Sequence, residues 1–483
     1  MPAGDSPDVL VARFLRANNF NETFAAFVRE TNLVPESITN NPSDLTIEQI
    51  LEEKKLYDLA IRFEKFNVGA GDVDFAVPYP NTPTSLTTLS TAFNILSLNL
   101  ASLVIPSDES TSPSAQQVII SATSDKALRI YSAKEPHELV IPHPISGLHA
   151  GPILCVQAVA QKWLLTASMA GDIAISNIRG DVVHRWEGHT KYIVKLAVSD
   201  PLPESTESEE VRYIAAASYD KSFSVHKLRI PSDHAPADPE DEEAVAETKK
   251  PSSEYLQTVT FPETVEDVIF TKDYRESSTD ASLLLLIATI RDSAYLHIYS
   301  TSTRASTSSS SSLSKPFTFL SKNPLNATST TWLTYTPTSL VPHPQHPHLI
   351  ALITSSLPIP KLIIYNLSTF TVEKEFTVTV NLSAYSTGIV AWRGDASASG
   401  VWVNSDDGVV KGIEVKTGKV KVELKAHDGR KVRCLAAGTV RSATNGATTE
   451  SENYDDDDSQ ELLISGGFDG ALKVWKAGPI EAE

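Results

Sequence analysis

The stretch Glu461–Lys476, ELLISGGFDGALKVWK, decides the fold. Two short apolar runs, Leu462–Ile464 and Ala471–Trp475, lie on either side of Phe468–Gly470. The Asp-Gly pair in the middle is a signal for a tight turn between two strands. The second run alternates apolar and polar residues, which is typical of a half-buried strand rather than a helix. The stretch therefore predicts a β-hairpin.

Four polar side chains in and before this hairpin are placed to pair with one another. They are His427, Ser465, Asp469 and Trp475. A histidine ring can donate to the turn carboxylate while a hydroxyl and an indole N–H extend the chain, so that a buried cluster is fully paired. The arrangement resembles the tetrad of the WD-repeat family, whose repeats form the four-stranded blades of β-propellers. The resemblance implies that these residues hold a blade together and catalyse nothing.

Strand–turn–strand patterns recur from Thr84 onward, mostly with further strand candidates before and after them. Repeats of four strands indicate a propeller once loop insertions are allowed for. We therefore predict a mainly β fold, a seven-bladed WD-repeat β-propeller over residues 83–477. The predicted hairpins are Val118–Tyr131, Trp163–Ile178, Arg212–Leu228, Leu283–Tyr299, Leu349–Leu367, Val401–Val415 and Leu462–Trp475.

Two strands are placed by their position in this count. Thr330–Thr334 is the candidate for the first strand of the fifth blade. The last blade has too few residues after Trp475 for its outer strand, and Ser85–Phe93 has no other place. We expect Ser85–Phe93 to supply that strand, because such closure joins both ends of the ring and removes exposed sheet edges.

The N-terminal region reads as a helical hairpin over residues 5–34, with apolar residues at helical spacing. The string VLVARFLRANNFNETFAAFVRET resembles the LisH motif, a hairpin known in that family for homodimerisation. Asn19 stands where glycine is usual and Phe24 where alanine is usual. The residues that the resemblance assigns to dimerisation are Phe14, Leu15, Phe20, Thr23, Phe24 and Phe27.

A unit this small seldom buries enough surface to be stable alone without a metal, disulfide or partner chain. Pairing with a second copy supplies that surface, so we expect a homodimer. The alternative is a hairpin docked on its own propeller. A third, amphipathic helix is expected over residues 44–68, either as a short coiled coil that extends the dimer or as a helix on the propeller.

Composition limits the classes of function. The chain has 483 residues, 41% of them hydrophobic, and only two cysteines, Cys155 and Cys434, so we expect neither a disulfide framework nor a cysteine-rich zinc site. The net charge of −19 argues against nucleic acid, because phosphate binding needs an excess of Lys and Arg. Met1–Val9 has no apolar core, and Leu283–Ala288 is too short to cross a bilayer. We expect a cytoplasmic or nuclear protein that binds no membrane.

Five acidic or serine-rich insertions lengthen the loops, and we expect them to be disordered. They are solvated spacers or, alternatively, phosphorylated or partner-binding segments. By the strand count each lies between the first and second or the third and fourth strands of a blade. In WD-repeat propellers these two loop types share one rim, here called the insertion rim. The insertions are Asp200–Val211, Pro231–Glu254, Asp273–Asp280, Ser300–Ser314 and Thr439–Gln460.

The opposite rim, here called the short-loop rim, carries the turns between second and third strands and the loops between blades. A protein partner needs about 800 Å² of ordered surface on one side of the contact. We predict the main protein-binding surface on the short-loop rim, with Lys126 and Lys221 as exposed turn residues. A dimer presents two copies of this surface and raises avidity.

Two alternatives remain. Arg179 and Arg229 stand where some WD-repeat proteins carry the arginine that docks onto a cullin-type ubiquitin ligase, although the usual preceding Trp-Asp pair is missing. The other is an enzyme with its site in the propeller channel, which would need converging histidine and acidic side chains there. The chain has no nucleophile motif and no glycine-rich phosphate loop.

The histidines of PHPQHPH, which are His343, His346 and His348, favour an ordinary inter-strand loop over a metal site, because prolines separate them and no carboxylate is near. We therefore predict no catalytic, metal or cofactor site and no small-molecule substrate. The predicted function is a non-enzymatic scaffold or adaptor that binds other proteins.

Overall fold

The computed structural model describes residues 7–33, 46–47, 74–86, 93–105, 114–206, 208–231, 250–275, 283–301, 316–326, 335–355, 359–383, 386–394, 398–441 and 459–478. They belong to two compact units, Met1–Val68 and Gly69–Glu483, each described by itself.

The first unit contains a pair of helices, α1 (Pro7–Ala17) and α2 (Asn21–Thr31). Asn19 and Asn32 have φ angles of 59° and 53°. Asparagine tolerates this left-handed conformation, which is typical of the residues that follow a helix, so both helices end shortly before such a residue. The helix expected over residues 44–68 lies outside the described residues except at positions 46 and 47.

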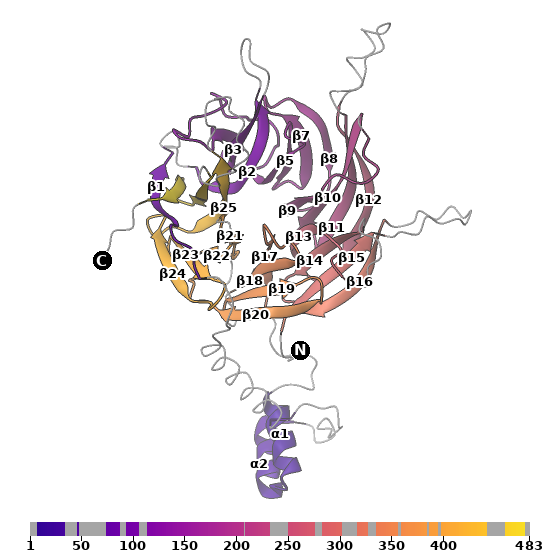
Figure 1. Ribbon diagram of the computed structural model, residues 1–483. Helices are drawn as coiled ribbons and strands as arrows, with labels where there is room; N and C mark the ends of the chain where they lie inside the picture. Colours follow the sequence, from indigo (N-terminus) through magenta and orange to yellow (C-terminus); the bar gives the residue numbers. More distant parts are fainter. Residues whose placement is uncertain are drawn as a thin grey trace, which may run out of the picture. The chain divides into compact units, whose positions relative to one another are not determined.

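The described strands of the second unit form seven sheets arranged in a ring (Figure 1), six with four strands and one with three. The first four blades contain β2 (Ile95–Ile105), β3 (Ser114–Thr123), β4 (Leu128–Ser132); β5 (Ile153–Val159), β6 (Trp163–Ser168), β7 (Asp172–Asn177), β8 (Val182–Glu187); β9 (Ile193–Val198), β10 (Glu209–Ser218), β11 (Ser222–Pro231), β12 (Ser252–Thr260); β13 (Val265–Lys272), β14 (Leu284–Ile290), β15 (Tyr295–Thr301) and β16 (Phe317–Pro324).

The last three blades contain β17 (Pro337–Pro342), β18 (Leu349–Thr354), β19 (Lys361–Asn366), β20 (Thr371–Thr377); β21 (Val390–Trp392), β22 (Gly400–Asn404), β23 (Val409–Glu414), β24 (Val420–Lys425); and β25 (Val432–Arg441), β26 (Ser459–Gly467), β27 (Leu472–Ala477), with β1 (Pro80–Ser85) as the outer strand. All seven predicted hairpins are therefore confirmed. The predicted strand Thr330–Thr334 lies outside the described residues. In the structure β17 is the innermost strand of the fifth blade. The prolines at both ends of β17 made it hard to predict as a strand, although an edge strand tolerates proline.

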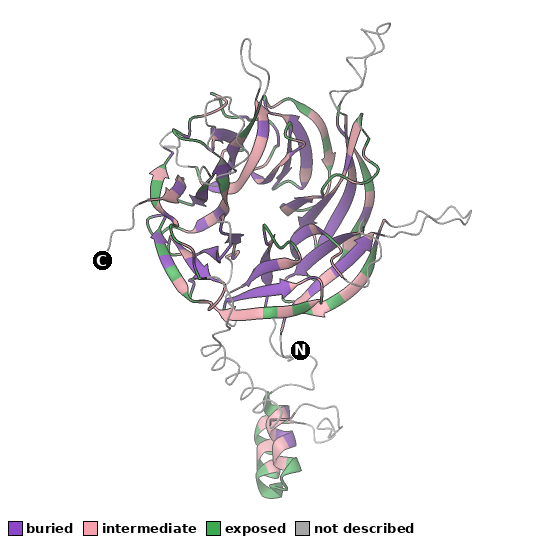
Figure 2. Cartoon of the chain, in the orientation of Figure 1, coloured by how far each residue is buried: buried purple, intermediate pink, exposed green. Residues whose placement is uncertain are grey.

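The core lies between neighbouring sheets. Every residue of β6, β14 and β22 is buried, because each of these middle strands has a blade on either side. Figure 2 shows burial concentrated in the middle strands, whereas the residues of the outermost strands are mostly half-buried or exposed. This explains why the middle strands are continuously apolar in sequence.

An N-terminal strand closes the ring, but it lies earlier in the chain than expected. β1 pairs antiparallel with β27, with Thr84 opposite Val474 and Ser85 opposite Lys473. The predicted strand Ser85–Phe93 is wrong as a range, since β1 ends at Ser85. Pro80 and Pro83 lie within β1, where they are tolerated because an outer strand needs ladder hydrogen bonds on one side only.

The residues just before β1 are anchored to the sixth blade. Phe75 is buried with its ring 6.1 Å from that of Trp402, and its backbone N–H donates to Glu414 at 3.1 Å. The guanidinium of Arg393, which is fully buried, lies 4.3 Å from the Phe75 ring centroid and donates to the carbonyl of Ala76 at 2.7 Å. The chain is thus held by side chains as well as by strand pairing.

The strand order places all five insertions on the insertion rim, because each joins a first to a second strand or a third to a fourth. One expectation differs from the structure. Residues 200–206 and 208–211, expected to be disordered, extend the β9–β10 hairpin. The N–H of Leu202 donates to the carbonyl of Val211 at 2.8 Å, and the N–H of Val211 donates to Ser205 at 2.9 Å. The acidic residues of this segment favour a prediction of disorder, and the sequence does not indicate these local hydrogen bonds.

Candidate interaction surfaces

The structure brings the four tetrad residues of the seventh blade into one hydrogen-bonded chain. His427 Nδ1 donates to Asp469, 2.9 Å from Oδ1, and its Nε2 accepts from the Ser465 hydroxyl at 3.1 Å. Trp475 Nε1 donates to the same hydroxyl at 3.0 Å. Burial lowers the pKa of His427, although Asp469 opposes the shift, so the ring is neutral with one donor and one acceptor.

The second blade has a partial copy of this chain. His149 lies 2.7 Å from Asp172 through Nδ1 and 2.8 Å from the Thr166 hydroxyl through Nε2. Sequence reasoning missed Asp172 because it follows the turn glycine, Gly171, whereas Asp469 precedes Gly470. In place of the tryptophan stands Ser176, whose buried hydroxyl has no partner among the described residues.

The third blade replaces the tryptophan by histidine. His189 lies 2.9 Å from Asp220 through Nδ1 and 2.9 Å from the Ser224 hydroxyl through Nε2. His226 lies 3.2 Å from the same hydroxyl. Burial lowers the pKa of His226 to about 4, and the neighbouring histidines add to the shift. The repeats therefore keep a buried polar chain even where its composition changes.

In the first blade an arginine takes the histidine's role. Arg129 donates to Asp125 at 2.7 Å and to Thr123 at 2.5 Å. Burial of Asp125 alone would raise its pKa, but the hydrogen bonds from Arg129 and Thr123 outweigh it and lower the pKa. The hydrogen bonds within these clusters stabilise the turns of the short-loop rim, which is a structural task rather than a catalytic one.

The two lysines predicted to contact a partner lie at corresponding places in their turns. Lys126 and Lys221 are both exposed and have φ angles of 66° and 69°. Lys221 Nζ donates to the Pro262 carbonyl at 2.5 Å and lies 3.5 Å from Glu263. Lys126 therefore presents its charge more freely than Lys221.

Arg179 and Arg229 lie towards the insertion rim. Arg179 is exposed in the turn after β7, and its backbone N–H donates to the Asn177 side chain at 2.9 Å. Arg229 lies within β11 and pairs with Glu209 at 3.1 Å. The two arginines are thus not equivalent, because only Arg179 has no ion pair among the described residues.

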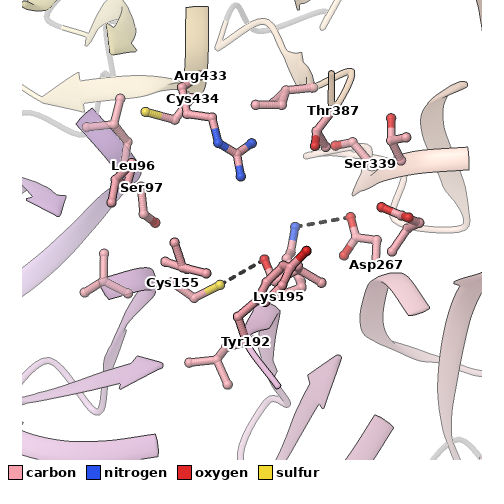
Figure 3. Close-up of a pocket in the computed structure, with 18 of the residues that line it drawn as sticks. Leu96, Ser97, Cys155, Tyr192, Lys195, Asp267, Ser339, Thr387, Arg433 and Cys434 are labelled. Atoms are coloured by element: carbon pink, nitrogen blue, oxygen red, sulfur yellow. Dashed lines mark hydrogen bonds and ion pairs between the residues drawn. The ribbon is translucent and has the colours of Figure 1, made fainter. Parts of the chain in front are cut away.

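A cavity of about 360 Å³ lies at the centre of the ring, lined by the innermost strands (Figure 3). Lys195 pairs there with Asp267 at 3.3 Å, and Asp267 also accepts the N–H of Leu340 at 2.8 Å. Burial raises the pKa of Asp267, against the influence of Lys195. The residues that line this cavity include the acidic Glu266 and Asp267 but no histidine, so the lining does not combine histidine with acidic side chains.

Both cysteines line the cavity as free thiols. The thiol of Cys155 lies 3.0 Å from the Val194 carbonyl, and burial raises the pKa of both Cys155 and Cys434 to about 12. Such thiols are poor nucleophiles at neutral pH. In the described part of the chain no group of histidine, cysteine and acidic residues is arranged to hold a metal ion.

The histidines of PHPQHPH stabilise their own loop. His343 Nδ1 accepts the backbone N–H groups of Gln345 at 3.1 Å and His346 at 3.0 Å. Its ring lies 4.5 Å from that of Trp392.

The described helices include none that is long and apolar enough to span a membrane.

The six predicted dimerisation residues of the helical pair differ in burial: Phe20 and Thr23 are exposed, whereas Phe14, Leu15, Phe24 and Phe27 are half-buried. Phe20 is 51% exposed, and no residue of α2 is buried. Phe24, Phe27 and Val28 are half-buried and lie on one side of α2 at helical spacing. Among the described residues, α2 packs against α1.

Comparisons with known proteins give a family match and structural matches. Residues 7–34 match the LisH domain family. Among solved structures, the crystal structure of Saccharomyces cerevisiae Sqt1 is similar, with a TM-score of 0.48 and 11% sequence identity; the match covers 83% of this chain and 99% of that chain. No curated protein matches the sequence.

Proposed function

We propose that the protein is a non-enzymatic scaffold or adaptor of the cytoplasm or nucleus. Its LisH domain at residues 7–34 and its seven-bladed β-propeller support this proposal, because the combination is typical of protein-interaction scaffolds. It dimerises through the LisH helices and binds partner proteins through the short-loop rim of the propeller.

The observation that carries this proposal is the difference between the two rims. All five insertions join strands at the insertion rim, and their sequences are acidic or serine-rich. The turns of the short-loop rim are fixed by buried polar chains, such as those of His149, His189 and His427. A surface that is ordered before binding loses less conformational entropy on association.

Dimerisation is supported by α2, which has no buried residue and whose apolar Phe24, Phe27 and Val28 are only half-buried in one chain. A ligase receptor role would use Arg179 and Arg229, but the pairing of Arg229 with Glu209 leaves one of the two side chains engaged. No described feature of the channel favours an enzyme over a scaffold.

The test compares charge reversals at the two ends of one strand. Lys126 precedes β4 on the short-loop rim, and Lys134 follows β4 on the insertion rim; both are exposed. Tagged full-length protein carrying Lys126→Glu, Lys221→Glu or both is compared with Lys134→Glu and with the unaltered chain, and co-purified proteins are quantified by mass spectrometry.

We expect the short-loop variants to lose specific partners that the Lys134→Glu variant retains. A further variant, with residues 232–249 and 442–458 replaced by short Gly-Ser linkers, should also retain them. Loss of partners in this linker variant, with retention in the Lys126→Glu and Lys221→Glu variants, would contradict the proposal.

A further inference from the structure

The innermost strands share a local irregularity that decides which side chains face the channel. In six of the seven blades the second residue of the innermost strand is a β-bulge, left without a partner on the next strand. A β-bulge changes the direction in which the side chain of the extra residue points. All six bulge residues line the central cavity: Leu96, Leu154, Val194, Glu266, Thr338 and Arg433.

Only two of these six bulge residues are charged, and their situations differ. Glu266 accepts a hydrogen bond from Arg291 Nε at 2.6 Å. Arg433 is half-buried, and Figure 3 shows its guanidinium pointing into the cavity. Among the residues that the structure describes, Arg433 has no hydrogen-bond or ion-pair partner.

A second hollow, of about 710 Å³, continues the cavity to the surface and shares Tyr219, Thr387 and Arg433 with it. It is lined by loops and turns of the short-loop rim, including Arg430 and Phe468. Arg430 is exposed, its side chain likewise has no hydrogen-bond or ion-pair partner among the described residues, and Phe468 is 38% exposed. An apolar ring and two guanidinium groups therefore border one opening.

The acidic groups that line the two hollows do not neutralise these arginines. Glu266 is paired with Arg291 at 2.6 Å, Asp267 with Lys195 at 3.3 Å and Asp406 with Lys431 at 2.9 Å. Each lining carboxylate thus has its own cation, which leaves Arg433 and Arg430 in excess. In a chain of net charge −19 this is a local reversal of sign.

We propose that the opening binds an acidic segment of a protein partner, with an anionic side chain seated on Arg433 and an apolar neighbour packed on Phe468. A guanidinium binds a carboxylate or a phosphate group through paired N–H donors, so both anions share the chemistry. The combined hollow accommodates several side chains, as peptide and ligand pockets do, rather than a single free ion. The inference deepens the proposed function, because it names the ligand of the short-loop rim.

The test uses the full chain and three immobilised heptapeptide pools that differ only at the central residue, which is aspartate, asparagine or phosphoserine. We expect the aspartate or the phosphoserine pool to retain about tenfold more protein than the asparagine pool, since hydrogen bonds to charged groups are strong. Preference for the first identifies a carboxylate, and preference for the second identifies a phosphate. Rising salt should weaken either preference.

Arg433→Gln should reduce retention to the level of the asparagine pool, whereas Lys134→Gln, on the insertion rim, should leave it unchanged. Arg430→Gln, at an exposed loop position, should give a partial loss and serves if Arg433→Gln does not fold. Equal retention by all pools, or a preference that survives both arginine substitutions, overturns the inference. If the Lys126→Glu and Lys221→Glu variants still lose partner proteins in that case, the proposed function stands without the acidic-segment site. If these variants keep their partners, the proposed function and the acidic-segment site are both wrong.

Discussion

Arg393 and Glu461 lie on neighbouring blades and are joined by two hydrogen bonds, 3.1 Å from Nε to Oε1 and 2.6 Å from a terminal nitrogen to Oε2. Both residues are buried. Arg393 also donates to the carbonyls of Ala76 and Pro78, ahead of the closing strand. The pair therefore couples the sixth blade, the seventh blade and the N-terminal closure.

Removing the charge of Glu461 should destabilise the propeller strongly. Glu461→Gln leaves a buried guanidinium without its anion, and we expect the free energy of unfolding to fall by about 3 kcal/mol or more. Glu423→Gln is the matched control, because Glu423 pairs with Lys411 at 3.0 Å while its side chain is 59% exposed. Its loss should be at most about 1 kcal/mol. Urea unfolding of the full chain measures both, and equal effects would contradict the coupling.

The tetrad should depend on the Ser465 hydroxyl. Ser465→Ala leaves His427 Nε2 and Trp475 Nε1 without their partner, at a cost of about 1–3 kcal/mol for each unsatisfied buried group. Ser176→Ala removes a buried hydroxyl that has no partner among the described residues, so it should be close to neutral. Melting temperatures of the two variants should differ clearly, and a Ser176→Ala variant that melts as low as Ser465→Ala would argue against the tetrad's role.

Stability should fall as the pH drops from about 6.5 towards 4. Burial holds the pKa of His226 at about 4, below its usual 6.5. Between these values the unfolded chain binds more protons than the folded one, so protonation favours unfolding. His226→Gln should reduce the difference in melting temperature between pH 7 and pH 5, whereas His143→Gln, at an exposed position, should not. An unchanged difference in the His226→Gln variant would show that this ring does not contribute.

The LisH face should control the oligomeric state. Phe27→Asp places a carboxylate on the apolar side of α2, where burial in a dimer interface would cost several kcal/mol. Ala26→Asp is the control, since Ala26 is exposed and lies on the opposite side of the helix. Light scattering on full-length protein should give a dimer for the unaltered chain and Ala26→Asp, and a monomer for Phe27→Asp. If the unaltered chain is a monomer at micromolar concentration, the predicted dimer is wrong.

The sequence predicts the hairpins well because their signals are local. In Leu462–Trp475 the alternation and the Asp-Gly turn lie within one short stretch. β1 was misplaced because Pro80 and Pro83 are tolerated only on an outer strand, which the sequence does not reveal by itself. Strand position in the sheet has to be known first.

The candidate site was harder to predict. The partnership of Arg393 with Glu461 joins residues 68 positions apart, and no local pattern indicates it. In the sequence, Arg433 reads as one more polar residue at the start of an apolar strand. Its place in the channel depends on a one-residue bulge in β25, and register irregularities of this kind have no sequence signature here.

The most direct test of the central claim is hydrogen–deuterium exchange of the full chain with and without a co-purified partner. If partners bind the short-loop rim, exchange should slow on binding in its turns, such as residues 124–127, 219–222 and 428–432. Residues 177–181 and 366–371, on the insertion rim, should exchange as in the free protein. Protection confined to the insertion rim, with the short-loop turns unchanged, would contradict the account.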